Sequence, residues 1–367
     1  MKTLLITNSV FNCNEGDANS TAGSDVQLTL LESLNLNNEL KVDVLDCSES
    51  GSVNFGGDYQ NKIKGLKVGG YLRRIMPVTV LNALLYLYKN KPNLIVKYNL
   101  YIQQLVAIII YRLLFNVKVI VVVQDYRKGK SFTVRQRLSD KLCIQLLRFT
   151  DYCLPITDYI SDEIPLHKGR KKIYSGGVTR ACENLILHKK NIMKKQAVFA
   201  GYLSEYNGLD VIVNFWLEND IKIKLVIYGD GPLKSFVENS QRKCEYIVYR
   251  GKVNQKVVME EIQRSNFYFC LRYSKGIDSR YFYPSKFFIG LYSSSVLLYN
   301  RFECLLSDFD LDYPFVLDES FSGLANLLNS DDESLINNLA EEQQNILKNH
   351  KSWVQVLSES IKETYEL

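Results

Sequence analysis

The sequence predicts an α/β protein made of two Rossmann-like domains that face a cleft. Short apolar runs alternate with helix-like segments in both halves of the chain, which is typical of parallel sheets covered by helices. The chain has 367 residues, too many for one ordinary core. A polar, basic stretch at residues 182–196 interrupts the alternation. We therefore expect a first domain at residues 1–181, a linker at 182–196 and a second domain at 197–350.

The first domain shows six strand-like runs with helix-like segments between them. The strand-like runs are rich in Val, Ile and Leu, which favours buried strands of a parallel sheet. These strands are expected at residues 3–7, 42–46, 93–97, 117–123, 151–156 and 171–175. The helices are expected at residues 24–36, 78–90, 101–115, 133–149 and 158–164.

The second domain repeats the alternation from Ala197 to about residue 329. Two helix-like segments then finish the chain, at residues 332–349 and 351–366. We assign residues 351–367 to a separate terminal helix.

Residues 100–123 are long and apolar enough to be considered as a membrane-spanning helix. Polar side chains interrupt the stretch at Gln103, Gln104, Arg112, Asn116 and Lys118. The composition also changes at Asn116, from Leu and Ile to Val. This change favours a buried helix that ends there and is followed by a buried strand.

Cysteine and histidine usage argues against disulfides and against a metal site. The eight cysteines form no CxxC pair, and the three histidines lie far apart in the sequence. The apolar run at the N-terminus is too short for a secretory signal. We expect reduced thiols, a cytoplasmic location and no bound metal.

The charge is unevenly distributed along the chain. Residues 1–180 contain 24 Lys and Arg against 15 Asp and Glu, whereas residues 181–367 contain 21 against 25. A basic half is attracted to anionic surfaces such as a membrane leaflet or a lipid diphosphate. Ordinary solvated surface charge explains the same numbers, so both interpretations stay open.

Two glycine turns in the second domain join a strand to a helix. In VFAGYLSEYNGLD the strand ends at Gly201, and Asn207 could donate a hydrogen bond from the following loop. In KLVIYGDGPLKSFV, Gly229 and Gly231 permit a tight turn, and Pro232 suits the first turn of the next helix. Turns of a parallel sheet meet at one edge, where helix N-termini can hold a phosphorylated ligand. Simple connection of strand to helix is the alternative role.

A third signal, YPSKFFIGLYSS, begins a helix with a hydroxyl and a cation. Ser285 and Lys286 lie at the positive end of the helix dipole, where Lys is unfavourable unless an anion binds beside it. Lys286 therefore favours a diphosphate site over a chance arrangement.

The first domain offers fewer candidates. Gly23 and Ser24 come before or at the start of a helix and could hold a ligand at its N-terminus or cap it. Asp125 follows a buried strand and could orient an acceptor hydroxyl or act as a base. A turn or helix cap is the alternative role of Asp125.

These ordered motifs resemble the nucleotide-sugar domain of GT-B glycosyltransferases, especially glycosyltransferase family 4. The resemblance rests on AGYLSEYNGLD, YGDGPL, YRGKV with VMEEI, and YPSKFFIGLYSSSVLLYN, which span about 100 residues of the chain. It implies a nucleoside-diphosphate sugar bound in the second domain and an acceptor in the first. It also implies a terminal helix, KSWVQVLSESIKETY, that crosses back onto the first domain, and no required metal or cofactor.

The resemblance implies roles for particular residues. Gly201 lines the diphosphate loop, Gly229 and Asp230 lie near the nucleotide, and Lys252 and Val253 flank the base. Ser285 and Lys286 match the helix that meets the diphosphate and the sugar.

The sequence also departs from the family. Tyr281 and Ile289 stand where the family has two Glu residues, and Asp278 is the nearest acid. Tyr202 and Asn207 stand where a basic pair is common, and Arg272 and Lys275 could supply charge from another position. Gln124-Asp125 replaces a His-Asp pair, so Asp125 and Asp278 are the candidate catalytic acids.

We therefore expect a metal-independent glycosyltransferase. Its acceptor would be a glycan or a lipid-linked oligosaccharide for capsule, O-antigen or a similar surface polysaccharide, with peripheral contact to the anionic inner membrane face. Nucleic acid is not an expected partner. Because the two Glu residues are missing, a non-catalytic subunit of the same fold is an alternative function. A nucleotide-sugar epimerase is disfavoured because histidines are scarce.

Overall fold

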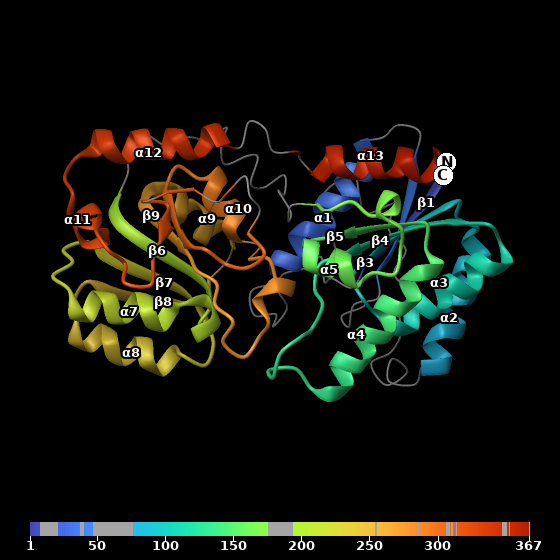
Figure 1. Cartoon of the computed structure of the whole chain (residues 1–367), viewed down its shortest axis with the longest axis horizontal. Coiled ribbons are helices and arrows are strands. Elements are labelled where there is room, and N and C mark those ends of the chain that lie inside the picture. The colour runs from blue at the N-terminus through green and yellow to red at the C-terminus, as the bar shows by residue number, and fades with distance from the viewer. Residues whose placement is uncertain are drawn as a thin grey trace. The chain divides into compact units, whose positions relative to one another are not determined.

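The computed structural model divides the chain into two compact units (Figure 1). It describes residues 1–7, 21–36, 40–46, 76–174, 194–253, 255–284, 286–305, 309, 311–312, 314–346, 351 and 353–366. Unit 1 contains residues 1–179, 280–282 and 351–367. Unit 2 contains residues 180–279 and 283–350.

Unit 1 is built on a five-stranded parallel sheet. Its strands are β1 (Lys2–Thr7), β2 (Lys41–Asp46), β3 (Leu94–Tyr98), β4 (Lys118–Val123) and β5 (Tyr152–Pro155). They lie in the order β2-β1-β3-β4-β5. The crossovers therefore change direction between β1 and β3, and ligands of such sheets bind at the carboxyl edge beside this change.

The helices of unit 1 cover both faces of this sheet. They are α1 (Thr21–Leu36), α2 (Met76–Asn90), α3 (Ile102–Leu114), α4 (Val134–Leu146) and α5 (Asp158–Glu163). Right-handed crossovers place α1 on one face and α2, α3 and α4 on the other, because the first crossover runs in the opposite direction. Figure 1 shows α2, α3 and α4 side by side beneath the strands. Helix α4 begins with a capping box formed by Thr133 and Gln136.

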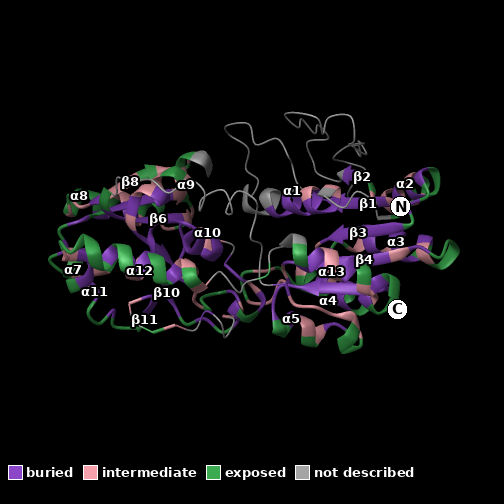
Figure 2. Cartoon of the chain, turned by 90° about the horizontal axis from the view of Figure 1, so that it is seen from above, coloured by how far each residue is buried: buried purple, intermediate pink, exposed green. Residues whose placement is uncertain are grey.

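The terminal helix α13 (Trp353–Glu366) belongs to unit 1 and packs against α1. Glu363 of α13 accepts a hydrogen bond from the Tyr152 hydroxyl of β5 and an ion pair from Lys172, whose Nζ lies 3.1 Å away. The last helix of the chain therefore completes the unit formed by the first residues. The buried strands that it covers appear purple in Figure 2.

Unit 2 is built on a six-stranded parallel sheet. Its strands are β6 (Lys194–Tyr202), β7 (Lys224–Asp230), β8 (Ile247–Gly251), β9 (Ser265–Cys270), β10 (Val296–Asn300) and β11 (Val316–Leu317). They lie in the order β11-β10-β9-β6-β7-β8, so the crossovers change direction between β6 and β9. The carboxyl ends of β6 and β9 are therefore the expected ligand position in this sheet.

Helices cover both faces of the second sheet as well. They are α7 (Leu209–Glu218), α8 (Lys234–Lys243), α9 (Gln255–Arg264), α10 (Lys286–Tyr292), α11 (Leu324–Asn329) and α12 (Glu333–Ile346). In Figure 1, α7 and α8 lie on one face, and α9, α10 and α12 on the other. Helix α10 is fixed closely against the sheet, because a Cβ on Gly290 would lie 2.5 Å from Cδ1 of Leu297. Its fully buried Phe287 and Phe288 also pack against Phe309.

The structure confirms the predicted two Rossmann-like sheets and corrects some local predictions. The stretch 100–123 forms helix α3 and strand β4, as predicted, and none of the described helices is long and apolar enough to cross a membrane. The strand predicted at 171–175 is wrong, because within 171–174 only Lys171 makes an isolated bridge to β5. Most of the predicted linker lies outside the described residues, and its last three residues belong to β6.

Candidate functional site

The carboxyl ends of β6 and β7 meet where two glycines face each other. Gly201 and Gly229 are partners in the parallel ladder. A Cβ on Gly229 would lie 1.8 Å from the carbonyl oxygen of Gly201, and Gly229 has a φ of +132°. Only glycine fits there. The lack of a side chain at Gly229 thus lets β7 approach β6 closely at this point. The contact between the two strands fixes the shape of the sheet edge that a ligand would meet.

Asp230 stabilises the same turn. Its Oδ1 accepts a hydrogen bond of 2.9 Å from the backbone N–H of Gly231. Gly231 in turn passes close to Leu203, whose carbonyl oxygen would lie 2.6 Å from an added Cβ. Asp230 therefore has a structural role in holding the turn, beside the nucleotide contact that the sequence predicts.

Lys286, the first residue of α10, reaches the end of β6. Its Nζ donates a hydrogen bond of 2.7 Å to the carbonyl oxygen of Ala200 and lies 3.3 Å from where a Cβ of Gly201 would be. Lys286 is partly buried. This burial, together with the positive charge of Arg272, lowers the pKa of Lys286 to about 8, although Cys270 acts in the opposite direction. Among the described residues no carboxylate pairs with Lys286.

Arg272 follows β9 and brings a second cation to this edge. Its guanidinium donates a hydrogen bond of 3.0 Å to Oδ1 of Asn207 and lies over the Tyr206 ring, 5.5 Å from the centroid. The amide nitrogen of Asn207 donates to the carbonyl oxygen of Tyr202 at 2.8 Å. The structure therefore brings together Arg272, Asn207 and the loop after Gly201.

Asn300 is a site residue that the sequence reasoning missed. Its Oδ1 accepts a hydrogen bond of 2.7 Å from the backbone N–H of Arg272, and its amide nitrogen donates to the Arg272 carbonyl oxygen at 2.8 Å. Asn300 thus fixes the backbone from which the Arg272 side chain extends. Its place at the carboxyl end of the buried run VLLYN was the available signal.

Other predicted residues of unit 2 lie further along the edge or outside the described residues. Lys252 and Val253 follow β8, which is the edge strand and is separated from β6 by β7. Asp278 lies partly buried in the loop between β9 and α10. Ser285 lies outside the described residues.

The structure shows what Lys275 and Tyr281, two residues that the sequence singled out where it departs from the family, contact. Lys275 does not supply a free charge, because its Nζ pairs with Asp210 at 2.8 Å. Tyr281, at the position of a family Glu, belongs to unit 1. Its hydroxyl lies 2.9 Å from Nζ of Lys128 and 3.0 Å from Oε1 of Glu163. Tyr281 therefore serves a contact with unit 1 residues.

In unit 1, Asp125 lies just after β4 and is held by Asn99, which follows β3. The Asn99 amide nitrogen donates to Oδ2 of Asp125 at 3.2 Å, and the Asp125 N–H donates to Oδ1 of Asn99 at 3.3 Å. Burial and, next, the charge of Asp125 raise the pKa of the neighbouring Tyr98. Asp125 is thus a positioned carboxylate at the carboxyl edge, as its predicted role requires.

Gly23 and Ser24 lie in the first turn of α1, which begins three residues before the predicted start. Nothing is described of the side chains in that turn. Among the residues that the structure does describe, no group of three or more His, Cys, Asp and Glu side chains could hold a metal ion.

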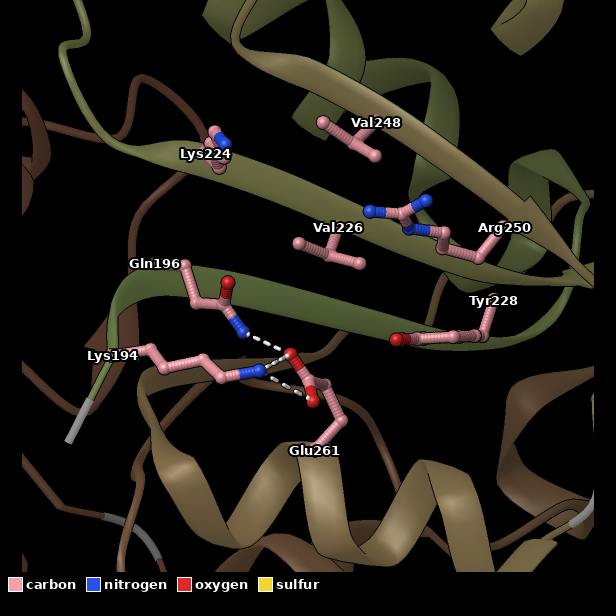
Figure 3. Close-up of a pocket in the computed structure, with 8 residues that line it drawn as sticks. All are labelled: Lys194, Gln196, Lys224, Val226, Tyr228, Val248, Arg250 and Glu261. Carbon is pink, nitrogen blue, oxygen red and sulfur yellow. Dashed lines mark hydrogen bonds and ion pairs between the residues drawn. The ribbon is translucent and has the colours of Figure 1, made fainter. Parts of the chain in front are cut away.

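A pocket of 470 Å³ lies on the face of the unit 2 sheet beside α9 (Figure 3). It is lined by Lys194, Gln196, Lys224, Val226, Tyr228, Val248, Arg250 and Glu261. Lys194 and Gln196 both bond to Glu261, at 2.8 and 2.6 Å, which fixes one side of the pocket. It contains none of the residues predicted for the donor site.

No protein-family model matches this sequence, and no curated protein matches it significantly. Solved structures do match it along its whole length. Anabaena HepE, solved with UDP and glucose, has a TM-score of 0.65 at 12% identity and covers 100% of this chain and 99% of its own.

Two further structures agree. The lipopolysaccharide outer core galactosyltransferase WaaB has a TM-score of 0.63 at 10% identity, and sucrose-phosphate synthase from Thermosynechococcus elongatus has 0.71 at 11%. Each alignment covers 100% of this chain and 99% of the other. The chain therefore has the GT-B glycosyltransferase fold, as its motifs predict.

Proposed function

We propose that this protein is a glycosyltransferase that moves a sugar from a nucleoside-diphosphate sugar to a glycan or a lipid-linked oligosaccharide. The single observation that carries the proposal is the meeting of two cations, Lys286 and Arg272, beside Gly201 at the carboxyl edge of the unit 2 sheet. A partly buried lysine with a lowered pKa, next to a second cation, is stabilised when an anion binds between them.

The proposed chemistry is displacement of the diphosphate from the anomeric carbon by an acceptor hydroxyl. Lys286 and Arg272 stabilise the negative charge that develops on the leaving diphosphate, so the reaction is proposed to need no metal. Asn207 and Asn300 position Arg272. In unit 1, Asp125 orients the acceptor hydroxyl or accepts its proton, and Asp278 is the second candidate acid.

Neighbouring structures support the donor class. HepE binds UDP and glucose, and WaaB is a lipopolysaccharide galactosyltransferase. We accordingly propose a role in the synthesis of capsule, O-antigen or a similar surface polysaccharide, at the inner face of the membrane. The excess of basic residues in the first half of the chain supports this location.

Nucleotide binding tests the proposal. The protein is heated with UDP, GDP, ADP or CMP, and tight binding of one of them raises the unfolding temperature by mass action. Lys286→Ala is expected to weaken that binding about 30-fold, as for loss of a charged hydrogen-bond partner worth ~2 kcal/mol. The matched control is Lys222→Ala, an exposed residue that precedes β7 at the opposite edge of the sheet. If none of the nucleotides stabilises the protein, the proposal is wrong.

A second candidate is a non-catalytic subunit with the same fold. The replacement of the family Glu by Tyr281, which bonds to Lys128 and Glu163, favours it. Release of nucleoside diphosphate from a bound nucleotide sugar separates the two functions. Binding without any release, with acceptor glycans present, would favour the subunit.

A further inference from the structure

We propose that the outer face of α2, α3 and α4 is a docking surface for a membrane leaflet that contains anionic phospholipids. We call it the docking face and define it by nine exposed apolar residues: Leu81, Leu85 and Tyr88 of α2, Ile110, Leu113 and Leu114 of α3, and Val134, Leu138 and Leu142 of α4. The inference rests on the proposed membrane-linked acceptor, but it concerns a surface of unit 1 that shares no residue with the donor site.

Each helix of the docking face has apolar side chains where a surface helix is usually polar. In α4 the exposed apolar residues recur at Val134, Leu138 and Leu142, a spacing of four that places them on one stripe. The side of α4 that faces the core carries Cys143 and Ile144 instead. Val134 is 71% exposed. The stripe therefore contributes nothing to the core of unit 1. Its contact with water is energetically unfavourable unless another apolar surface covers it.

Helices α2 and α3 extend the same surface. In α2 the large exposed apolar residues are Leu81, Leu85 and Tyr88, again on one side of the helix, opposite the buried Leu87. Leu113 of α3 is 70% exposed. The ring of Tyr88 lies 5.9 Å from that of Phe115, just after α3, so the apolar surface is continuous from one helix to the next. Figure 1 and the packing of α3 against both neighbours show the three helices side by side.

Cations predominate in the segment that contains the docking face, although Lys97 is buried and Arg112, Lys118 and Lys128 pair with Asp151 or Glu163 just outside it. Residues 76–150 contain twelve Lys and Arg but only two Asp, a net charge of +10, compared with +5 for the whole chain. One of these acids, Asp140, is buried and paired with Arg127. It is the only acidic residue in α2, α3 or α4.

Several of these cations flank the apolar stripe itself. Arg137 and Lys141 are exposed on α4, one helical turn apart, next to Leu138. An apolar helix face bordered by Lys and Arg is the pattern of proteins that lie on anionic bilayers, because the apolar residues enter the headgroup region while the cations meet lipid phosphates.

Other partners fit less well. A second copy of the chain would bring two surfaces of the same charge together, which is unfavourable. Nucleic acid would satisfy the cations but would leave the nine apolar side chains in water. A leaflet with anionic lipids satisfies both.

Sedimentation with vesicles tests the proposal on the full chain. We expect the protein to bind vesicles of phosphatidylcholine mixed with an equal part of phosphatidylglycerol at low salt. It should bind vesicles of phosphatidylcholine alone much more weakly, and should release the mixed vesicles as salt is raised. The variant R137Q/K141Q is expected to bind the mixed vesicles about 30-fold more weakly, which corresponds to ~1 kcal/mol for each cation removed.

A second variant tests the apolar component. L113S/L138S replaces two exposed residues and is expected to weaken binding at every salt concentration, since burial of leucine on a membrane does not depend on salt. The matched controls lie in unit 2: Leu335→Ser, also exposed, and K234Q/K243Q of α8. Both controls are expected to bind like the unaltered protein.

The outcomes separate this inference from the proposed function. The docking face would be overturned if the protein did not bind mixed vesicles at low salt, or if the control variants lost as much vesicle binding as the docking-face variants. Tighter binding to duplex DNA than to the vesicles would also overturn it. Nucleotide binding is measured on the same samples. Retained nucleotide binding with no vesicle binding overturns only the docking face, whereas vesicle binding without nucleotide binding supports it and contradicts the donor site.

Discussion

Replacing Lys286 by Met should make the protein more stable while it weakens nucleotide binding. The pKa of Lys286 falls from its ordinary value of 10.5 to about 8, mainly because the side chain is partly removed from water. At pH 7 the lysine is charged in both the folded and the unfolded chain, and the charge is less favourable in the folded one. A drop of about 2.5 pH units corresponds to at most ~3 kcal/mol of lost folding stability. Met keeps the length and the apolar stem but has no charge.

The hydrogen bond to Ala200 offsets part of this gain. Its loss costs about 1 kcal/mol, so we expect the free energy of unfolding of Lys286→Met to rise by ~2 kcal/mol at pH 7. The gain should shrink as pH rises from about 8 towards 10.5. In that range the folded lysine of the unaltered protein loses its proton before the unfolded one, which stabilises the unaltered protein.

Urea unfolding with and without the bound nucleotide measures both effects. Without nucleotide, the midpoint of Lys286→Met should lie above that of the unaltered protein, and added nucleotide should raise it much less than it raises that of the unaltered protein. Lys222→Met, at an exposed position, should change neither. A loss of stability at pH 7, or a gain of the same size at pH 7 and pH 10, would refute the view that the Lys286 charge is unfavourably buried in the absence of an anion.

Three further predictions follow from the same site and from Asp125. Nucleotide affinity should fall about tenfold per pH unit above pH 8, because Lys286 of the free protein is then neutral. Calorimetry measures this affinity, and an affinity that stays constant up to pH 9.5 would contradict the prediction. Gly229→Ala should lower the free energy of unfolding by about 3 kcal/mol, since the new Cβ would lie 1.8 Å from the Gly201 carbonyl oxygen. Urea unfolding measures this loss, and an unchanged midpoint would show that the turn can open to admit the methyl group. Asp125→Asn should reduce kcat about 100-fold or more at unchanged nucleotide affinity, and an unaltered kcat would remove Asp125 from the chemistry.

Most of the fold could be predicted from the sequence because buried parallel strands have a strong local signature. The Val-rich run at 117–123 became β4, and the Leu and Ile-rich segment before it became α3. Residues 171–175 carried a similar signal, but the side chains of Lys171 and Lys172 make contacts with other parts of unit 1. Nζ of Lys171 donates to the carbonyl oxygens of Ser161 and Ile164, and Lys172 pairs with α13. Such tertiary bonds cannot be seen in a local pattern.

The site could be predicted only in outline. The motifs placed Gly201, Gly229 and Lys286 at one edge, since each follows or precedes a predicted element. They could not show that Arg272 bonds to Asn207, because the two are 65 positions apart and meet only through the order of the strands. The role of Asn300 depends on the same arrangement.

Unit 1 contains segments from both ends of the chain, so it cannot be completed until synthesis is nearly finished. Residues 280–282 and the terminal helix α13 belong to this unit, although its sheet is made from the first 155 residues. When that sheet leaves the ribosome, the helix that packs on α1 and the Glu363 partner of Tyr152 have not yet been made. Unit 2, whose residues lie between, can close before unit 1 is complete. Unit 1 should therefore be the last to reach its native state, and a truncation that removes α13 should leave it prone to aggregation.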